Sequence, residues 1–224
     1  MGEAIGQLLP SAVGVALSPL PIVAVVLMLA TERARANGPA FIVGWWLGLA
    51  VVGAVVLSTT GGASGSGGET PGWVNWLKLV LGVLLLVVGA RQWRGRPRGG
   101  GQAAMPKWMS ALDAFTPVKA SGAGFVLSAL NPKNLLLAIA GALAIAQAGI
   151  STGAQIGAYV VFVAIASVGV AAPVVLYFAL GERSRELLDA MKDWLARNNA
   201  VIMAVLLLII GVKLIGDAIS GFST

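Results

Sequence analysis

Long apolar stretches dominate this chain and restrict it to one class of fold. Six such stretches occur among its 224 residues, and a helix of roughly 20 apolar residues is enough to cross a bilayer. The hydrocarbon core offers no water to unpaired backbone groups, so a stretch of this length folds there as a helix. We therefore expect an all-α polytopic membrane protein with six transmembrane helices, near residues 6–30, 39–59, 72–93, 119–148, 152–180 and 199–220.

The composition supports this class and excludes several functions. Only 11% of the residues are charged, against about 25% in soluble domains, and the mean hydropathy is +0.89. The chain has no cysteine and no histidine, which excludes thiolate and imidazole metal sites and the commonest proton shuttle. Because paired intramembrane carboxylates are missing as well, we expect a protein that is not an enzyme and has no cofactor or metal site.

Basic residues gather in three connections between the apolar stretches, and this predicts the orientation of the chain. Basic loops remain in the cytoplasm, so we expect both termini to be extracytoplasmic. The same topology explains the formal net charge of +6 without a nucleic-acid partner. Twelve of the 15 Lys and Arg residues lie in or beside these connections: Arg33, Arg35, Arg91, Arg94, Arg96, Arg98, Lys107, Lys119, Arg183, Arg185, Lys192 and Arg197.

Two of the apolar stretches carry the same kind of interruption. Residues 16–21 read ALSPLP and residues 129–134 read ALNPKN, so each places a small polar residue directly before a proline. Proline inside a helix removes a hydrogen bond and clashes with the preceding turn. At the first helical position it is favoured, and Ser or Asn before it is a preferred N-cap whose side chain accepts a backbone N–H. We therefore predict that the first and fourth helices are broken, with half-helices that begin at Pro19 and Pro132.

These interruptions supply most of the candidate binding residues. Helix N-termini carry free N–H donors and partial positive charge, and Lys133 adds a full charge in an apolar region, where ionisable residues are costly and mark function. An anion between the two half-helices would compensate both the helix N-termini and the charge of Lys133. In the structural alternative, the prolines only kink packed helices, and Lys213 reaches outward to the interface. The predicted substrate-binding residues are Ser18, Pro19, Pro21, Asn131, Pro132, Lys133, Asn134 and Lys213.

The second half of the chain repeats features of the first half. Residues 84–91, LLLVVGAR, match residues 206–213, LLLIIGVK, at an offset of 122, and Val52-Gly53 matches Val168-Gly169. Three helices per repeat is an odd number, so the second repeat must be inverted in the membrane. Inverted repeats with interrupted helices are the architecture of many secondary transporters.

A segment of different character joins the two halves. We predict a first three-helix repeat over residues 1–93, a basic cytoplasmic linker over 94–118 and a second, inverted repeat over 119–224. The mixed-charge residues 182–198 are expected to lie on the same cytoplasmic surface. Within the linker, a short interfacial helix is expected to carry Trp108, Met109, Leu112 and Phe115 on about one face.

Several quoted stretches resemble a known family. ALSPLPIVAVVLML, RARANGPAFIVGW, PKWM followed by FTP, and LSALNPKNLLL resemble the actinobacterial glycolipid-addressing (GAP) family, which includes sulfolipid-addressing proteins and is placed in the lysine-exporter (LysE) superfamily. The resemblance covers nearly the whole chain. It implies a LysE-like fold of six helices in two repeats, location in the bacterial inner (plasma) membrane, and a role in moving cell-envelope glycolipids or related solutes outward.

Three functions follow as hypotheses. The first is a secondary transporter or flippase that exports a cell-envelope glycolipid, or a related solute with a polar or anionic head group, driven by an ion gradient because no Walker-type nucleotide motif is present. The second is a LysE-like exporter of amino acids or other small solutes. The third is an accessory subunit of a larger lipid-export system that does not itself transport. Membrane lipids are expected as neighbours, and homodimerisation is left open.

Overall fold

The computed structural model of the chain describes residues 2–61, 72–95 and 115–222, and over these residues the fold is helical, without strands. Its longest elements are the helices expected from the apolar stretches, and two shorter helix pairs replace the first and fourth. The described helices are α1 (Gly2–Ala16), α2 (Pro19–Leu29), α3 (Ala34–Gly61), α4 (Gly72–Arg94), α5 (Pro117–Phe125), the π-helix η2 (Val126–Leu130), α6 (Pro132–Ala146), α7 (Thr152–Leu180), the 3-10 turn η3 (Gly181–Arg183) and α8 (Ser184–Phe222).

Four continuous helices and two bent pairs are long and apolar enough to cross a membrane. The continuous spans lie in α3, α4, α7 and the Ala200–Phe222 part of α8. Helices α1 and α2 meet at 49°, and the α5–η2 segment meets α6 at 62°. Counting each bent pair as one span gives up to six crossings, and both bends fall at the predicted proline positions.

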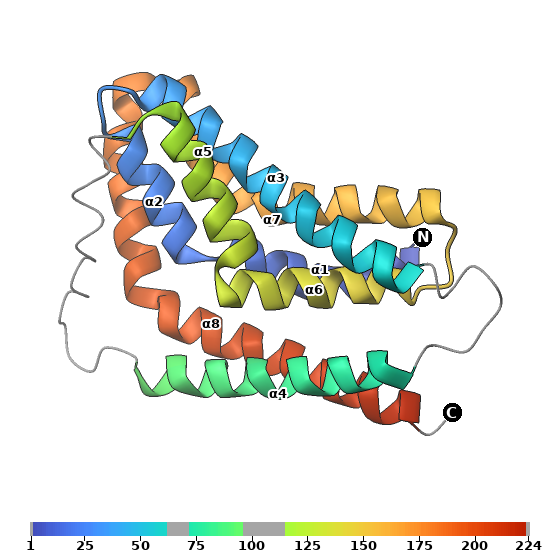
Figure 1. Cartoon of the computed structure of the whole chain (residues 1–224). Coiled ribbons are helices and arrows are strands. Elements are labelled where there is room, and N and C mark those ends of the chain that lie inside the picture. The colour runs from blue at the N-terminus through green and yellow to red at the C-terminus, as the bar shows by residue number, and fades with distance from the viewer. Residues whose placement is uncertain (1, 62–71, 96–114, 223–224) are drawn as a thin grey trace.

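The last helix is longer than the span that it contains. The span, Ala200–Phe222, agrees with the expected residues 199–220, and residues 184–199 precede it in the same continuous helix α8. Neither glycine nor proline occurs between Ser184 and Ile210, so no residue there interrupts the helix. Figure 1 shows that α8 bends along its length and then runs beside α4. The predicted interfacial helix, apart from Phe115, lies outside the described residues.

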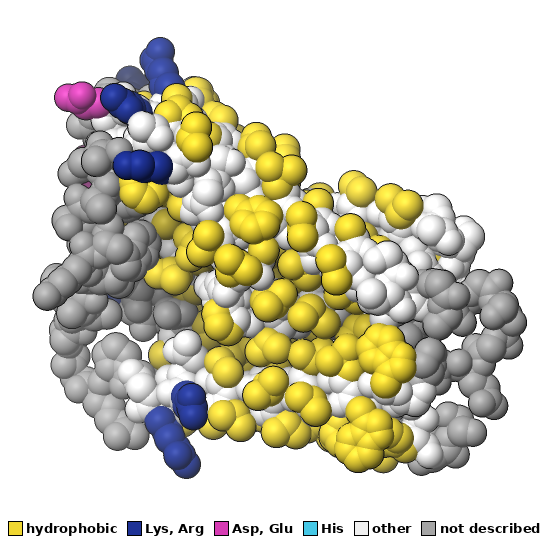
Figure 2. Space-filling view, in the orientation of Figure 1, with side chains coloured by type: hydrophobic (Ala, Val, Ile, Leu, Met, Phe, Trp, Pro, Cys, Tyr) yellow, Lys and Arg dark blue, Asp and Glu magenta, His cyan; other side chains and the backbone are white. Residues whose placement is uncertain are grey.

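The ends of the helices separate into two groups (Figure 1). Helices α2 and α4 end, and α3, α5 and α8 begin, on the left of the view. The N-terminus, the C-terminus and the connection from α6 to α7 lie on the right. Figure 2 shows Lys and Arg side chains gathered at the left end, while apolar side chains cover most of the visible face. This distribution fits a multi-pass membrane protein whose basic connections share one side.

Glycines allow several helices to pack backbone against backbone, as is common in membrane bundles. A Cβ added to Gly44 of α3 would lie 1.8 Å from the carbonyl oxygen of Ser121 in α5. A Cβ added to Gly169 of α7 would lie 1.8 Å from the carbonyl oxygen of Ala16 in α1. Only glycine permits these two approaches, which fix both broken helices against long continuous ones.

Candidate functional site

The first break ends α1 and begins α2. Ser18 occupies the N-cap of α2 with an extended backbone (φ −73°, ψ 107°), and Pro19 takes the first helical position. Both residues are buried. The predicted capping bond is wrong for this residue, because the Ser18 hydroxyl makes no cap hydrogen bond. Its oxygen instead accepts a hydrogen bond from a distant side chain, so it belongs to a tertiary contact.

The second break lies between the π-helix η2 and α6. Asn131 is the N-cap of α6, and its Oδ1 accepts the backbone N–H of Lys133 at 3.3 Å, which confirms the predicted cap. The Asn131 N–H closes the π-turn by donating to the carbonyl of Val126. The Asn134 side chain donates to the carbonyl of Leu127 at 2.8 Å. Two side chains of the motif thus satisfy backbone groups that the break leaves unpaired.

Lys133 brings the two breaks together. Its Nζ donates to the Ser18 hydroxyl at 3.1 Å, across 115 positions of sequence. The same nitrogen lies 2.6 Å from the Sδ of Met203, which α8 contributes. Among the described residues, no carboxylate forms an ion pair with Lys133. The result is a partly buried cation held by two neutral atoms, next to the first turns of two half-helices.

The remaining motif residues differ in their surroundings. Pro19 and Pro21 are buried in α2, whereas Pro132 is exposed at the start of α6. Asn134 is fully buried, and its Oδ1 has no hydrogen-bond partner within the described part of the chain. The prolines therefore set the backbone geometry of the breaks, while Ser18, Lys133 and Asn134 supply the polar atoms around them.

Lys213 lies apart from this cluster, although the sequence groups it with the same site. It is ten residues beyond Met203 on α8, which corresponds to about 15 Å along a helix. Its Nζ forms an ion pair with Asp217 Oδ2 at 2.8 Å, so it does not simply reach outward to the interface. Lys213 and Asp217 line a cavity of about 20 Å³, room for about one water molecule.

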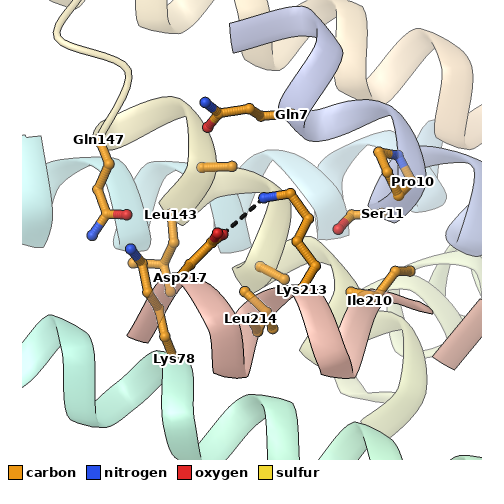
Figure 3. A pocket seen from close by; sticks show the side chains of 12 residues that line it. Gln7, Pro10, Ser11, Lys78, Leu143, Gln147, Ile210, Lys213, Leu214 and Asp217 are labelled. Atoms are coloured by element: carbon orange, nitrogen blue, oxygen red, sulfur yellow. Dashed lines mark hydrogen bonds and ion pairs between the residues drawn. The ribbon is translucent and has the colours of Figure 1, made fainter. Parts of the chain in front are cut away.

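This cavity also contains residues that the sequence does not single out as a site. Figure 3 shows Gln7 of α1, Lys78 of α4 and Gln147, the C-cap residue of α6, among the residues that line it. Lys78 was detectable as one of only three basic residues that lie outside the basic connections. Met203, Gln7 and Gln147 carry no such signal, because neutral side chains are unremarkable in an apolar helix.

A comparison with known families agrees with the sequence motifs. The family model of Sap, the sulfolipid-1-addressing protein, matches residues 8–220. The chain belongs to the sulfolipid-1-addressing protein family. The matched region contains both breaks, Lys133, Lys213 and the residues that line the cavity beside it, except Gln7. No curated protein and no solved structure gives a significant match.

Proposed function

We propose that this member of the sulfolipid-1-addressing protein family is a secondary transporter of the bacterial inner membrane. It moves a glycolipid, or a related lipid with an anionic head group, outward across the membrane. The observation that carries the proposal is the hydrogen bond from Lys133 to Ser18, which joins the two helix breaks around one cation. The family description supports a lipid substrate, since it names a sulfolipid.

An anionic head group suits the chemistry at the breaks. A cation within the membrane is costly unless it is compensated, and the atoms nearest to Lys133 are a hydroxyl oxygen and a thioether sulfur. The first turns of α2 and α6 add backbone N–H donors and positive dipole ends. A sulfate or phosphate group near Lys133 would accept these donors and neutralise the charge. The head group enters this region while the lipid chains remain in the bilayer.

The packing of α4 against α8 supports an inverted repeat. A pseudo-two-fold axis would exchange the two repeats. At the sequence offset of 122, Gly89 then corresponds to Gly211, and Ala204 corresponds to Gly82. A Cβ on Gly89 would lie 3.5 Å from the Ala204 carbonyl oxygen, and a Cβ on Gly211 would lie 3.0 Å from the Gly82 carbonyl oxygen. One contact is therefore the symmetry mate of the other, at the offset that the sequence repeat predicts.

Other helix pairs fit the same operation. It exchanges the α3–α5 pair with the α1–α7 pair, and each pair packs its backbones together at a glycine, Gly44 in one and Gly169 in the other. The two bent helices, α1–α2 and α5–α6, are exchanged as well. We assign the fold to a LysE-like arrangement on this basis. Rocking of one repeat against the other would expose the breaks to each side of the membrane in turn.

The orientation follows from the basic connections. They lie at one end of the bundle, and the positive-inside rule puts that end in the cytoplasm. Both termini and the α6–α7 connection then face outward. Transport from the cytoplasmic side requires a driving force, and the ion gradient across the inner membrane supplies one without nucleotide hydrolysis.

The test is transport by the purified protein in liposomes of neutral lipid. Fluorescent sulfatide, a sulfated glycolipid, is the probe, and fluorescent galactosylceramide is the same lipid without the sulfate. Movement between leaflets under a pH gradient is measured by bleaching with an impermeant reductant. We expect sulfatide to move faster than galactosylceramide. Lys133→Gln should slow sulfatide by roughly tenfold or more, because it removes a charge-assisted hydrogen bond.

The control variant is Lys119→Gln, which removes one lysine from the exposed start of α5 and should leave transport unchanged. Normal sulfatide movement by a well-folded Lys133→Gln protein would refute the binding region at the breaks. Failure of the unsubstituted protein to move either lipid would favour an accessory subunit. Efflux of radiolabelled amino acids from the same liposomes, without lipid movement, would favour a small-solute exporter.

A further inference from the structure

A second polar cluster lies away from the breaks, between α1, the end of α6, α4 and α8. We call it the outer cavity, since the predicted orientation puts it near the extracytoplasmic end. Four helices contribute to it, and its polar lining residues are Gln7, Ser11, Lys78, Gln147, Lys213 and Asp217. Within the described residues, no hydrogen bond joins any of them to Lys133 or Ser18. The outer cavity is thus a separate constellation along the same bundle.

The charges in the outer cavity do not balance. Lys78 and Lys213 supply two positive charges, and Asp217 supplies one negative charge. Asp217 is bonded to Lys213 at 2.8 Å, four residues earlier on the same helix. Lys78 interacts electrostatically with both residues, but it has no hydrogen bond to a described residue. One cation in a membrane-spanning bundle therefore lacks a counter-charge.

Neutral donors around the cavity add to this excess. The Nε2 of Gln147 is buried and has no hydrogen-bond partner within the described part of the chain. Figure 3 shows the carboxamide of Gln147 near the end of Lys78, on the side of the cavity that Asp217 also faces. The Gln7 side chain is less available, because its Nε2 already donates to Glu3. An amide N–H and an ammonium group without partners would both be satisfied by an oxyanion.

Asp217 occupies the place that such an anion would take. Its carboxylate is the only acidic group among the cavity-lining residues, and its side chain remains 41% exposed, beside a Lys213 side chain that is 36% exposed. An incoming oxyanion can therefore reach the pair without unfolding the bundle. The cavity has room for about one water molecule, so an oxyanion would fit only after the Asp217 carboxylate moves aside.

We infer that the outer cavity is a second binding site for an oxyanion, a sulfate or phosphate group, in which Asp217 is an internal substitute for the ligand. Lys78, Lys213 and Gln147 hold the oxyanion once Asp217 gives up its bond to Lys213. As a release site for the exported head group, this role rests on the proposed function. Binding itself does not depend on transport and is measured separately.

The experiment is native mass spectrometry of the full-length protein released from nanodiscs of neutral lipid. The nanodiscs contain either sulfatide or galactosylceramide, and a separate titration uses inorganic sulfate followed by calorimetry. Lys78→Gln should lower sulfatide retention by about tenfold. Asp217→Asn should raise it, because removal of the competing carboxylate frees Lys213. Galactosylceramide should be retained equally by all variants, and Lys119→Gln should match the unsubstituted protein.

Lys78→Gln should lower sulfatide retention and Asp217→Asn should raise it, so one variant still tests the site if the other folds poorly. Equal sulfatide retention by Lys78→Gln and Asp217→Asn would overturn the inference, as would weaker binding by a folded Asp217→Asn protein. If the two substitutions change the binding of sulfatide but not of inorganic sulfate, the site binds a lipid head group. If they change the binding of inorganic sulfate in the same way, the site binds free oxyanions. Either result supports the outer cavity as an oxyanion site.

Lys133→Gln separates this inference from the proposed function. If it blocks sulfatide movement while Lys78→Gln and Asp217→Asn change neither binding nor movement, the breaks are the binding region and the outer cavity is not. If the outer-cavity variants shift retention while Lys133→Gln moves sulfatide normally, the outer site stands and the proposal for the breaks fails.

Discussion

Replacing Gly44 by alanine should separate two helices that touch through their backbones. An added Cβ would lie 1.8 Å from the Ser121 carbonyl oxygen, 2.6 Å from its carbonyl carbon and 2.8 Å from its Cα. All three atoms belong to the backbone of α5, so no side-chain rotation relieves the overlap. The helices must move apart by more than about 1 Å to restore ordinary contact, and α5 carries the segment that ends at the second break.

The magnitude follows from two opposing contributions. Overpacking of a tight interface costs about 1–3 kcal/mol of folding free energy. Replacing glycine by alanine inside a helix contributes up to about 1 kcal/mol in the opposite direction. Gly122 on α5 isolates this second contribution, because a Cβ there has no atom within 4 Å. Gly44→Ala should therefore be less stable than Gly122→Ala by about 1–3 kcal/mol.

Equilibrium unfolding in mixed micelles of increasing dodecyl sulfate content, followed by tryptophan fluorescence, measures this difference. The chain has seven tryptophans, and Trp45 is fully buried one residue from Gly44. Lower stability should be accompanied by slower sulfatide movement, since displacement of α5 also moves Asn131. Equal stability of the Gly44→Ala and Gly122→Ala proteins would show that α3 and α5 are not in backbone contact.

Three further predictions test the orientation, the helix pair and the cap. In a chain without native cysteine, Thr152→Cys should react with an impermeant thiol reagent in intact cells and Glu32→Cys only after permeabilisation; the reverse pattern would invert the topology. Gly211→Ala should lower stability more than Gly216→Ala, because an added Cβ would lie 2.9 Å from two Leu86 side-chain atoms at Gly211 and would meet nothing at Gly216. Asn131→Ala should cost about 1 kcal/mol in the same unfolding assay through loss of the cap, and an unchanged midpoint would argue against it.

Sequence reasoning located the two breaks because their cause is local. Proline at the first helical position and a polar residue before it act within one turn, so Pro19 and Pro132 could be assigned from the hexapeptides alone. The continuity of α8 also has a local cause, since residues 184–210 contain no helix breaker. The charges of residues 182–198 indicated only that this part lies at the surface. Membrane-spanning helices can extend into water, and hydropathy marks only the part within the bilayer.

Tertiary partners explain what the sequence could not provide. The role of Ser18 depends on Lys133, which lies 115 positions away, and a local rule for serine before proline gave the wrong hydrogen bond. Met203 approaches Lys133 only because α8 runs past both breaks. The π-helix before Asn131 also lacked a sequence signal, because its extra residue is defined by a backbone pattern and not by side-chain type.

Lys213 and Lys133 show what the difference between local and tertiary partners means for function. Lys213 and Asp217 stand four positions apart, a spacing that places them on one helix face and allows an ion pair to be anticipated. Lys133 has no acidic residue at such a distance in the sequence, and the fold brings it a hydroxyl and a thioether but no carboxylate from the described residues. A cation that local sequence and described fold both leave without a counter-charge would be stabilised by an anion from outside the chain. We propose that a bound anion meets this need at Lys133, and transport would follow if the anion is a lipid head group that both sides of the membrane can reach.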